Sequence, residues 1–94
     1  MNLYEKYVGG DFPIPDTDIG GSCIDYWFDK EEVDRQTKCN PLVPLGFKAV
    51  ARDAGDNLIL QADNGEIYYC DHEDGRLIKL AKEMAEFLDT VKVE

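Results

Sequence analysis

Two apolar runs, residues 57–63 and 66–71, flank the dipeptide Asn64-Gly65. Asn-Gly between alternating apolar runs is the strongest short-range signal of a β-hairpin, because a two-residue turn needs positive φ at both central positions. The two strands of such a hairpin pair antiparallel. The dipeptide therefore predicts an antiparallel sheet at the centre of the fold.

The predicted turn also fixes which residues face each other. With that dipeptide as the loop, Leu60 lies opposite Tyr69 and Leu58 lies opposite Asp71. One face then carries mainly apolar side chains and is predicted to be buried: Leu58, Leu60, Ala62, Ile67 and Tyr69. The other face is mixed, so we expect it to be half covered or to carry a partner.

Further elements are predicted upstream of the hairpin. Residues 22–29 are rich in aromatic and β-favouring residues and predict a strand. Alternation places three side chains on its core face: Ile24, Tyr26 and Phe28. Asp29 is a suitable N-cap for a helix over about residues 30–37, which must end before the following Pro-rich loop. Residues 47–53 form another candidate strand.

The C-terminal region is predicted to be a helix. Apolar residues recur at intervals of three and four from Leu77 to Val91, which is the pattern of an amphipathic helix. The expected order is a strand, a short helix, three meandering strands and a final helix. We therefore predict a single α+β domain over residues 1–94. It has an antiparallel sheet of about four strands, a C-terminal helix packed on one face and a short helix after the first strand.

Charge is distributed unevenly along the chain. Twenty acidic and ten basic residues give a net charge of −10. Residues 11–34 carry eight acids and one base, a net of −7, and residues 53–74 carry seven acids and no base, another −7. Residues 35–52 hold four bases and no acid. This field opposes direct binding to nucleic acid and favours a basic protein partner. Solubility alone is the alternative explanation.

Composition also indicates in which cellular compartment the protein is found. No apolar run approaches the roughly 20 residues that a membrane span needs. The N-terminal residues show no basic region followed by an apolar run, so we expect no signal peptide. The three cysteines, Cys23, Cys39 and Cys70, form no C-x-x-C pair, which favours free thiols in a reducing environment. We therefore expect a cytoplasmic protein with no membrane contact.

The segment from Cys70 to Asp74 looks most like a reactive site, because it surrounds the only histidine, His72, with carboxylates. A zinc site would need two further ligands, and the sequence has no second closely spaced pair. The ligand spacing of a calcium loop and the motif of a phosphate-binding loop are both absent. We expect no metal, no cofactor and no catalytic residue, and His72 as a loop-anchoring or surface residue. A small metal-dependent enzyme is the alternative.

The order of these segments is itself informative. Residues 40–91 contain a loop with two prolines, a strand, a Gly-Asp-Asn turn, a hairpin that runs through IYY into DHE, and a closing LAKEMAEFLDTV segment. Upstream, YEKYVGGDF joins a tyrosine-bearing segment to a Gly-Gly turn. In this order and spacing, residues 4–91 resemble the SUKH superfamily, the Smi/Knr-like immunity proteins. Members usually begin with one or two further helices, so the resemblance implies an N-terminally short SUKH-like domain.

The resemblance implies a binding protein and not an enzyme. Many members of this superfamily are immunity proteins that bind and neutralise bacterial toxins, often nucleases, and others are regulatory scaffolds. A nuclease presents a basic cleft, which an acidic protein can block by mimicking phosphate charge. We therefore expect an immunity or inhibitor protein, as in toxin–antitoxin pairs. The alternative is a scaffold or regulatory module that acts as an oligomer through apolar surface left bare by the short N-terminus.

Partner-binding residues are expected on the first acidic segment of the chain. Their carboxylates would meet a basic surface: Asp16, Asp18, Asp25, Asp29, Glu31 and Glu32. Trp27 lies on the side of its predicted strand opposite the presumed core, where an aromatic side chain can anchor a partner. The alternative is that each carboxylate is an ordinary solvated charge and that Trp27 is buried.

Overall fold

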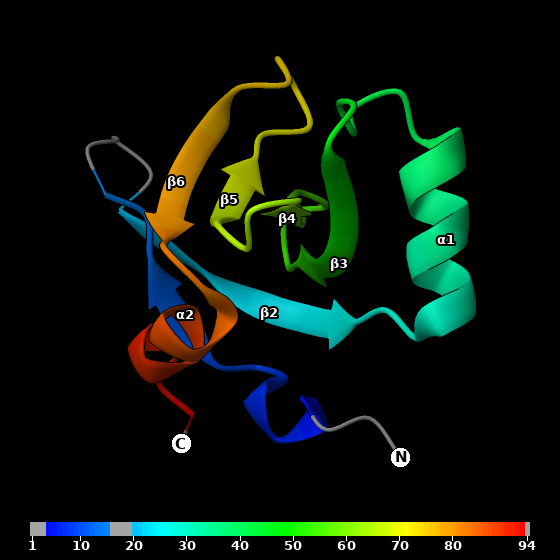
Figure 1. Ribbon diagram of the computed structural model, residues 1–94. Helices are drawn as coiled ribbons and strands as arrows, with labels where there is room; N and C mark the ends of the chain where they lie inside the picture. The colour runs from blue at the N-terminus through cyan, green and yellow to red at the C-terminus, as the bar shows by residue number, and fades with distance from the viewer. Residues whose placement is uncertain (1–3, 16–19, 94) are drawn as a thin grey trace.

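The computed structural model describes residues 4–15 and 20–93 of the chain (Figure 1). In this part of the chain the elements follow one another as η1 (Glu5–Tyr7, a 3-10 turn), β1 (Asp11–Pro13), β2 (Gly21–Trp27), α1 (Lys30–Cys39), β3 (Phe47–Asp53), β4 (Leu58–Ala62), β5 (Ile67–Cys70), β6 (Leu77–Ala81) and α2 (Met84–Thr90).

The strands form one sheet in the order β1-β2-β3-β4-β5-β6, and every neighbouring pair is antiparallel. The sheet is strongly twisted: β2 runs across the view of Figure 1, whereas β4 points along it. The predicted α+β class, antiparallel sheet and C-terminal helix are confirmed. The predicted strand number of about four is wrong, because the described residues form six strands. The two unexpected strands are β1 and β6.

β6 occupies the first part of the region that was predicted to be helical. Cys70 pairs with Leu77 and Tyr69 with Ile78, and the register shifts before Ala81 pairs with Ile67. This shift breaks the alternation of a regular strand. The apolar intervals of three and four residues in this segment, which predicted a helix, therefore belong to an irregular strand. The helix itself is confined to Met84–Thr90.

The β4–β5 hairpin forms with a longer loop than predicted. The amide of Ala62 donates to the carbonyl of Glu66 at 2.8 Å, and the amide of Gly65 donates to the carbonyl of Ala62 at 2.9 Å. Gly65 has φ of 94°, whereas Asn64 does not have positive φ. Three residues therefore make the loop, as in a type I turn followed by a glycine bulge. The predicted two-residue register is wrong by one position, and Leu60 pairs with Tyr68.

The shifted register divides the apolar residues between two faces, both of which are covered. One core gathers the side chains of Phe12, Ile14, Ile24, Trp27, Ala51, Ile59, Ile67, Tyr69, Ala81, Phe87 and Val91. The other gathers Phe28, Ala49, Leu58, Leu60 and Cys70. The predicted single buried face, which combined Leu60 with Ile67, is therefore wrong. β1 and α2 contribute to the first core, and residues of α1 and of the loop after it pack on the second.

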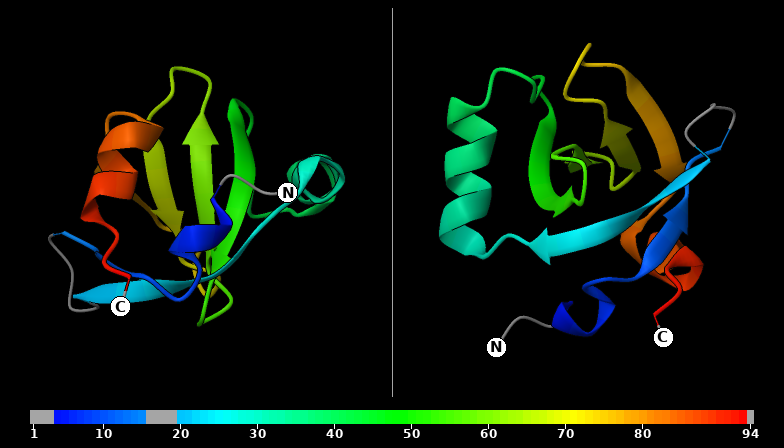
Figure 2. Two further views of the ribbon diagram at one scale, coloured as in Figure 1. Left: turned by 90° about the horizontal axis from the view of Figure 1, so that it is seen from below. Right: turned by 180° about the vertical axis from the view of Figure 1, so that it is seen from behind.

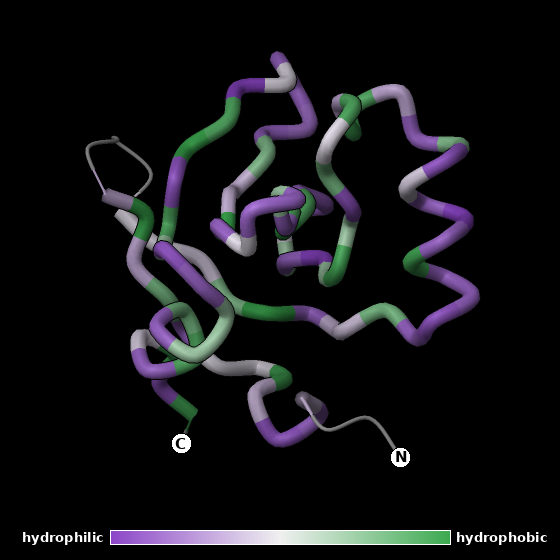
Figure 3. The backbone as a smooth tube through the Cα atoms, viewed as in Figure 1, coloured by the Kyte–Doolittle hydropathy of each residue, from purple (hydrophilic) through white to green (hydrophobic). Residues whose placement is uncertain are grey.

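α1 lies beside β3, on the side opposite α2 (Figure 2). β2 pairs only with residues 51–53 of β3, and the amide of Ala49, in the first part of β3, donates instead to the hydroxyl of Thr37 in α1 at 3.1 Å. No residue of α1 is buried. Figure 3 accordingly shows a mostly hydrophilic helix. The predicted helix after Asp29 is confirmed and extends to Cys39.

The segment after α2 is tied to β1 through the backbone. Asp11 in β1 donates to the carbonyl of Lys92 at 2.9 Å, and Lys92 donates back to Asp11 at 2.7 Å. Phe87 of α2 then packs edge-on against Phe12 and against Trp27, with ring centroids 5.4 and 6.4 Å apart. The closing helix is thereby fixed against β1 and β2.

Candidate functional site

A surface hollow lies between the end of β2 and the first turns of α1. We call it the acidic hollow, and its lining residues are Tyr26, Trp27, Asp29, Glu31, Glu32 and Arg35. Tyr26 is half-buried, while Asp29, Glu31 and Arg35 are exposed. The hollow thus combines an aromatic side chain with a rim that is mainly carboxylate.

An irregularity in β2 determines how Tyr26 reaches this site. Ile24 pairs with Asp53 but Tyr26 pairs with Arg52, so the register shifts around Asp25. Ile24 and Trp27 consequently belong to the first core, whereas Tyr26 packs on the second, beside Phe28. A regular strand would have placed Ile24 and Tyr26 on the same face.

Asp29 fixes the start of α1 and the position of the acidic rim. Its extended backbone is typical of an N-cap, and its Oδ1 accepts a hydrogen bond from the amide of Glu32 at 2.8 Å. Glu31 and Glu32 follow in the first turn, where carboxylates interact favourably with the positive end of the helix dipole. One local sequence signal therefore brings three carboxylates together.

Two arginines already interact with this region from within the chain. The side chain of Arg35 hydrogen-bonds to Glu32, which also accepts from Gln36, and these bonds lower the pKa of the Glu32 carboxyl. Arg52 donates to Asp25 at 2.6 Å and lies over the Tyr26 ring, 4.7 Å from its centroid. The hydrogen bond to Asp25 raises the pKa of the Arg52 guanidinium.

These contacts indicate what the hollow can bind. A guanidinium fits the Tyr26 face and a neighbouring carboxylate at once, as Arg52 demonstrates. Asp29 and Glu31 take part in no ion pair among the described residues. The hollow therefore offers two further carboxylates to a cationic side chain from outside.

The predicted partner-binding residues are partly brought together. Trp27, Asp29, Glu31 and Glu32 line the hollow. Asp25 is connected to it through Arg52, which pairs with Asp25 and lies over the ring of Tyr26. The remaining two residues, Asp16 and Asp18, lie outside the described residues.

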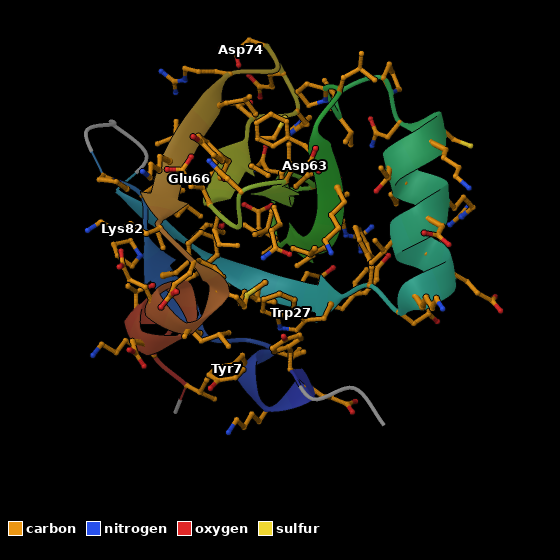
Figure 4. All side chains as sticks on the ribbon, viewed as in Figure 1. Tyr7, Trp27, Asp63, Glu66, Asp74 and Lys82 are labelled. Carbon is orange, nitrogen blue, oxygen red and sulfur yellow. The ribbon has the colours of Figure 1, made fainter. Side chains whose placement is uncertain are left out.

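The predicted orientation of Trp27 is wrong. Its side chain, labelled in Figure 4, points toward the inside of the fold. It is only 6% exposed and lies in the first core, and the centroid of the Tyr4 ring is 4.8 Å from that of its own ring. The register shift at Asp25 turns it inward, against the simple alternation of the strand. Its buried indole Nε1 has no acceptor among the described residues.

Sequence reasoning missed Tyr26 and Arg35 as members of this site. Alternation along the strand predicts Tyr26 on the core face, because it gives no sign of the register shift. The position of Arg35, three residues after Glu32 on a predicted helix, is a signal that could have found it. Arg52 is brought to Tyr26 by the pairing of β2 with β3, which no local sequence pattern predicts.

His72 has the anchoring geometry expected of a structural residue. Its amide donates to Oδ1 of Asn57 at 2.9 Å, and its ring Nδ1 lies 2.7 Å from the same oxygen. Cys70 instead lies in the second core, where its Sγ donates to the carbonyl of Leu42. Burial raises the pKa of the Cys70 thiol. The two side chains are thus engaged with different partners and form no nucleophile–base pair.

In the part of the chain that the structure describes, no three His, Cys, Asp or Glu side chains form a group that could hold a metal ion. Across those same residues, no helix has the length and apolar character required to cross a bilayer.

Comparisons of the chain with protein-family models, with curated proteins and with solved structures found no match. Membership of the SUKH superfamily therefore stays a prediction that depends on the order and spacing of the sequence segments.

Proposed function

We propose that this chain is a non-enzymatic acidic binding protein of SUKH type that binds and blocks a basic toxin or nuclease. The observation that carries this proposal is the acidic hollow, where the exposed carboxylates of Asp29 and Glu31 stand beside the half-buried ring of Tyr26. The net charge of −10 acts in the same direction, because it attracts a basic partner from a distance.

The blocking mechanism is electrostatic and steric. The cleft of a nuclease carries Lys and Arg side chains that bind phosphate groups. Carboxylates at the rim of the hollow take the place of those phosphates, and the body of the domain closes the cleft to substrate. A partner guanidinium is held by a carboxylate and a tyrosine face, in the manner that Arg52 adopts between Asp25 and Tyr26.

We also propose a bacterial, cytoplasmic setting for this activity. Cys23, Cys39 and Cys70 are all free thiols, which supports a reducing compartment. An immunity protein that acts there meets its toxin only after the toxin has entered or been made in the same cell.

The partner can be identified by site-specific photo-crosslinking in the native host. A photoreactive residue at position 31 is expected to capture a basic protein, whereas the same residue at position 89, an exposed acid on α2, captures none. The purified partner is then expected to lose its nuclease or toxic activity when one equivalent of this protein is added.

Salt dependence supplies the second readout. The association rate is expected to fall steeply between about 0.05 and 0.5 M salt, because screening shortens the reach of the acidic field. Glu31→Lys should slow association further. A captured partner that is acidic, or whose binding is indifferent to both salt and Glu31, would contradict the proposal.

A further inference from the structure

Leu45 is exposed to an extent that is unusual for a large apolar side chain. It is 101% exposed, whereas the other exposed large hydrophobic residues among those described, Val8 and Val93, are 38% and 48% exposed. A single exposed apolar side chain is ordinary, and it indicates a binding surface only where it belongs to a larger apolar patch.

The loop that carries Leu45, residues 40–46, is held firmly in place. We call it the Leu45 loop. The amide of Leu42 donates to the side-chain oxygen of Asn40 at 3.0 Å, and the amide of Val43 donates to the Asn40 carbonyl at 3.1 Å. Two prolines restrict the backbone further, and the amide of Asp63 donates to the Gly46 carbonyl at 2.8 Å. A tip presented by such a loop loses little conformational freedom on binding.

The surface beside the Leu45 loop is apolar and basic. The hollow next to it is lined by Thr37, Lys38, Cys39, Asn40, Pro41, Val43, Pro44, Leu45, Gly46 and Phe47, of which only Lys38 is charged. Lys38 is exposed and takes part in no ion pair among the described residues. The whole segment 35–52 contains four bases and no acid.

The acidic hollow is complementary to this surface. It offers an aromatic floor at Tyr26 and a rim of carboxylates, while the Leu45 loop offers an apolar tip with a free cation beside it. The two surfaces lie at opposite ends of α1, a helix of ten residues that spans about 15 Å. They are too far apart to meet within one chain, but they can meet between two.

We propose that two copies of this chain associate through the Leu45 loop of one copy and the acidic hollow of the other. Leu45 packs against the Tyr26 ring, and Lys38 pairs with Glu31 across the contact. The contact uses the hollow assigned to the basic partner, so the second copy occupies that site until the partner displaces it. The contact between copies is tested on the purified chain without any partner. A negative result there would therefore not bear on whether the chain binds a basic protein.

Sedimentation velocity of the full chain tests the contact. At about 0.15 M salt, where net repulsion between copies is largely screened beyond about 8 Å, the weight-average mass is expected to rise with concentration. Leu45→Asp should weaken association about tenfold or more, because it removes the apolar tip and adds a repelled charge. Val93→Asp, a change at another exposed apolar residue, is the matched control and should leave association unchanged.

A mixing experiment identifies the two halves of the contact. Glu31→Lys should weaken association as Leu45→Asp does, because it places a cation opposite Lys38. Each variant alone then retains one intact surface, so an equimolar mixture is expected to form a 1:1 complex that neither forms by itself. Circular dichroism verifies that both variants, which change exposed side chains, are folded.

Several outcomes would overturn the proposal. A wild-type chain that stays monomeric up to about 1 mM, the concentration at which even weak contacts are populated, rules out the contact. Association that Leu45→Asp abolishes but Glu31→Lys leaves intact would mean that Leu45 meets another surface. Variants that are both monomeric and fail to combine when mixed would also exclude the pairing of these two sites.

Discussion

The side-chain nitrogen of Asn57 donates to the buried carboxylate of Asp53 at 3.1 Å. Asp53 is 1% exposed, and it also accepts hydrogen bonds from the hydroxyl of Ser22 and from the amides of Gly55 and Asn57. The same Asn57 accepts from His72 through its oxygen. Asp53 and Asn57 together therefore join β2, the β3–β4 turn and the loop before β6.

Replacement of Asp53 by leucine is expected to lower the free energy of unfolding by about 3 kcal/mol, because buried amides and a hydroxyl lose their acceptor. Asp56→Asn, at an exposed residue of the same turn, should change it by less than about 0.5 kcal/mol. Urea denaturation at neutral pH measures both. Similar losses for the two variants would contradict a central role for Asp53.

The ion pair between Glu66 and Lys79 predicts that the fold loses stability over a defined range of acidic pH. Hydrogen bonds from Lys79 first, and then from Asn64 and Tyr68, lower the pKa of Glu66 from 4.5 to about 2. Because the folded-state pKa is the lower one, Glu66 stabilises the fold above about pH 4.5. That stabilisation is lost as the pH falls from about 4.5 to about 2.

The test is urea denaturation across this pH range. Glu66→Gln is expected to be less stable than the wild type at pH 7, with the difference shrinking as the pH approaches 2. Glu83→Gln, at an exposed acid without an ion pair among the described residues, controls for the loss of one charge. A constant difference between Glu66→Gln and wild type at all pH values would count against the ion pair.

Asp29 has two separable roles, as helix cap and as a rim carboxylate of the hollow. Asp29→Ala is expected to cost about 1 kcal/mol of stability, because the amide of Glu32 loses its acceptor. Asp29→Ser keeps a capping oxygen and should preserve most of that stability while it removes the charge. Thermal unfolding separates the two variants, and equal destabilisation by both would show that capping is not the cause.

Trp27 is expected to behave as a core residue. Trp27→Ala should cost about 3–5 kcal/mol, because it leaves a cavity beside Phe87 and Tyr4. Trp27→Phe should cost much less, since the indole N–H has no acceptor among the described residues. Trp27 is the only tryptophan, so its fluorescence reports directly on burial and should resist quenching by acrylamide. Strong quenching in the folded state would contradict the burial.

Elements marked by local chemistry could be predicted from the sequence. α1 begins after Asp29 because the cap and the first-turn acids favour that start, and it ends before the Pro-rich loop. The strands β4 and β5 could be predicted because apolar residues flank a turn dipeptide. Their pairing was missed by one residue, because Asn64-Gly65 is compatible with a loop of two residues or of three.

Features that depend on pairing between distant segments could not be predicted. The register shifts at Asp25 and between β5 and β6 are decided by neighbouring strands, and they turned Trp27 inward and made β6 resemble a helix. β1 is three residues long and ends at a proline, so it carries little strand signal of its own. In the site, the rim acids follow from α1, whereas Tyr26 and Arg52 required the folded sheet.

The meander order of the sheet has a consequence for how the chain folds. Each strand pairs with its neighbour in the sequence, and the longest of these connections, between β2 and β3, spans only residues 28–46. Such a topology has a lower contact order than sheets with crossovers, and we expect rapid folding without a slow search for distant strands. The link from Asp11 to Lys92 joins opposite ends of the described chain. Forming it therefore costs more conformational entropy than pairing two successive strands. Native-state hydrogen exchange should therefore find it among the first contacts to open.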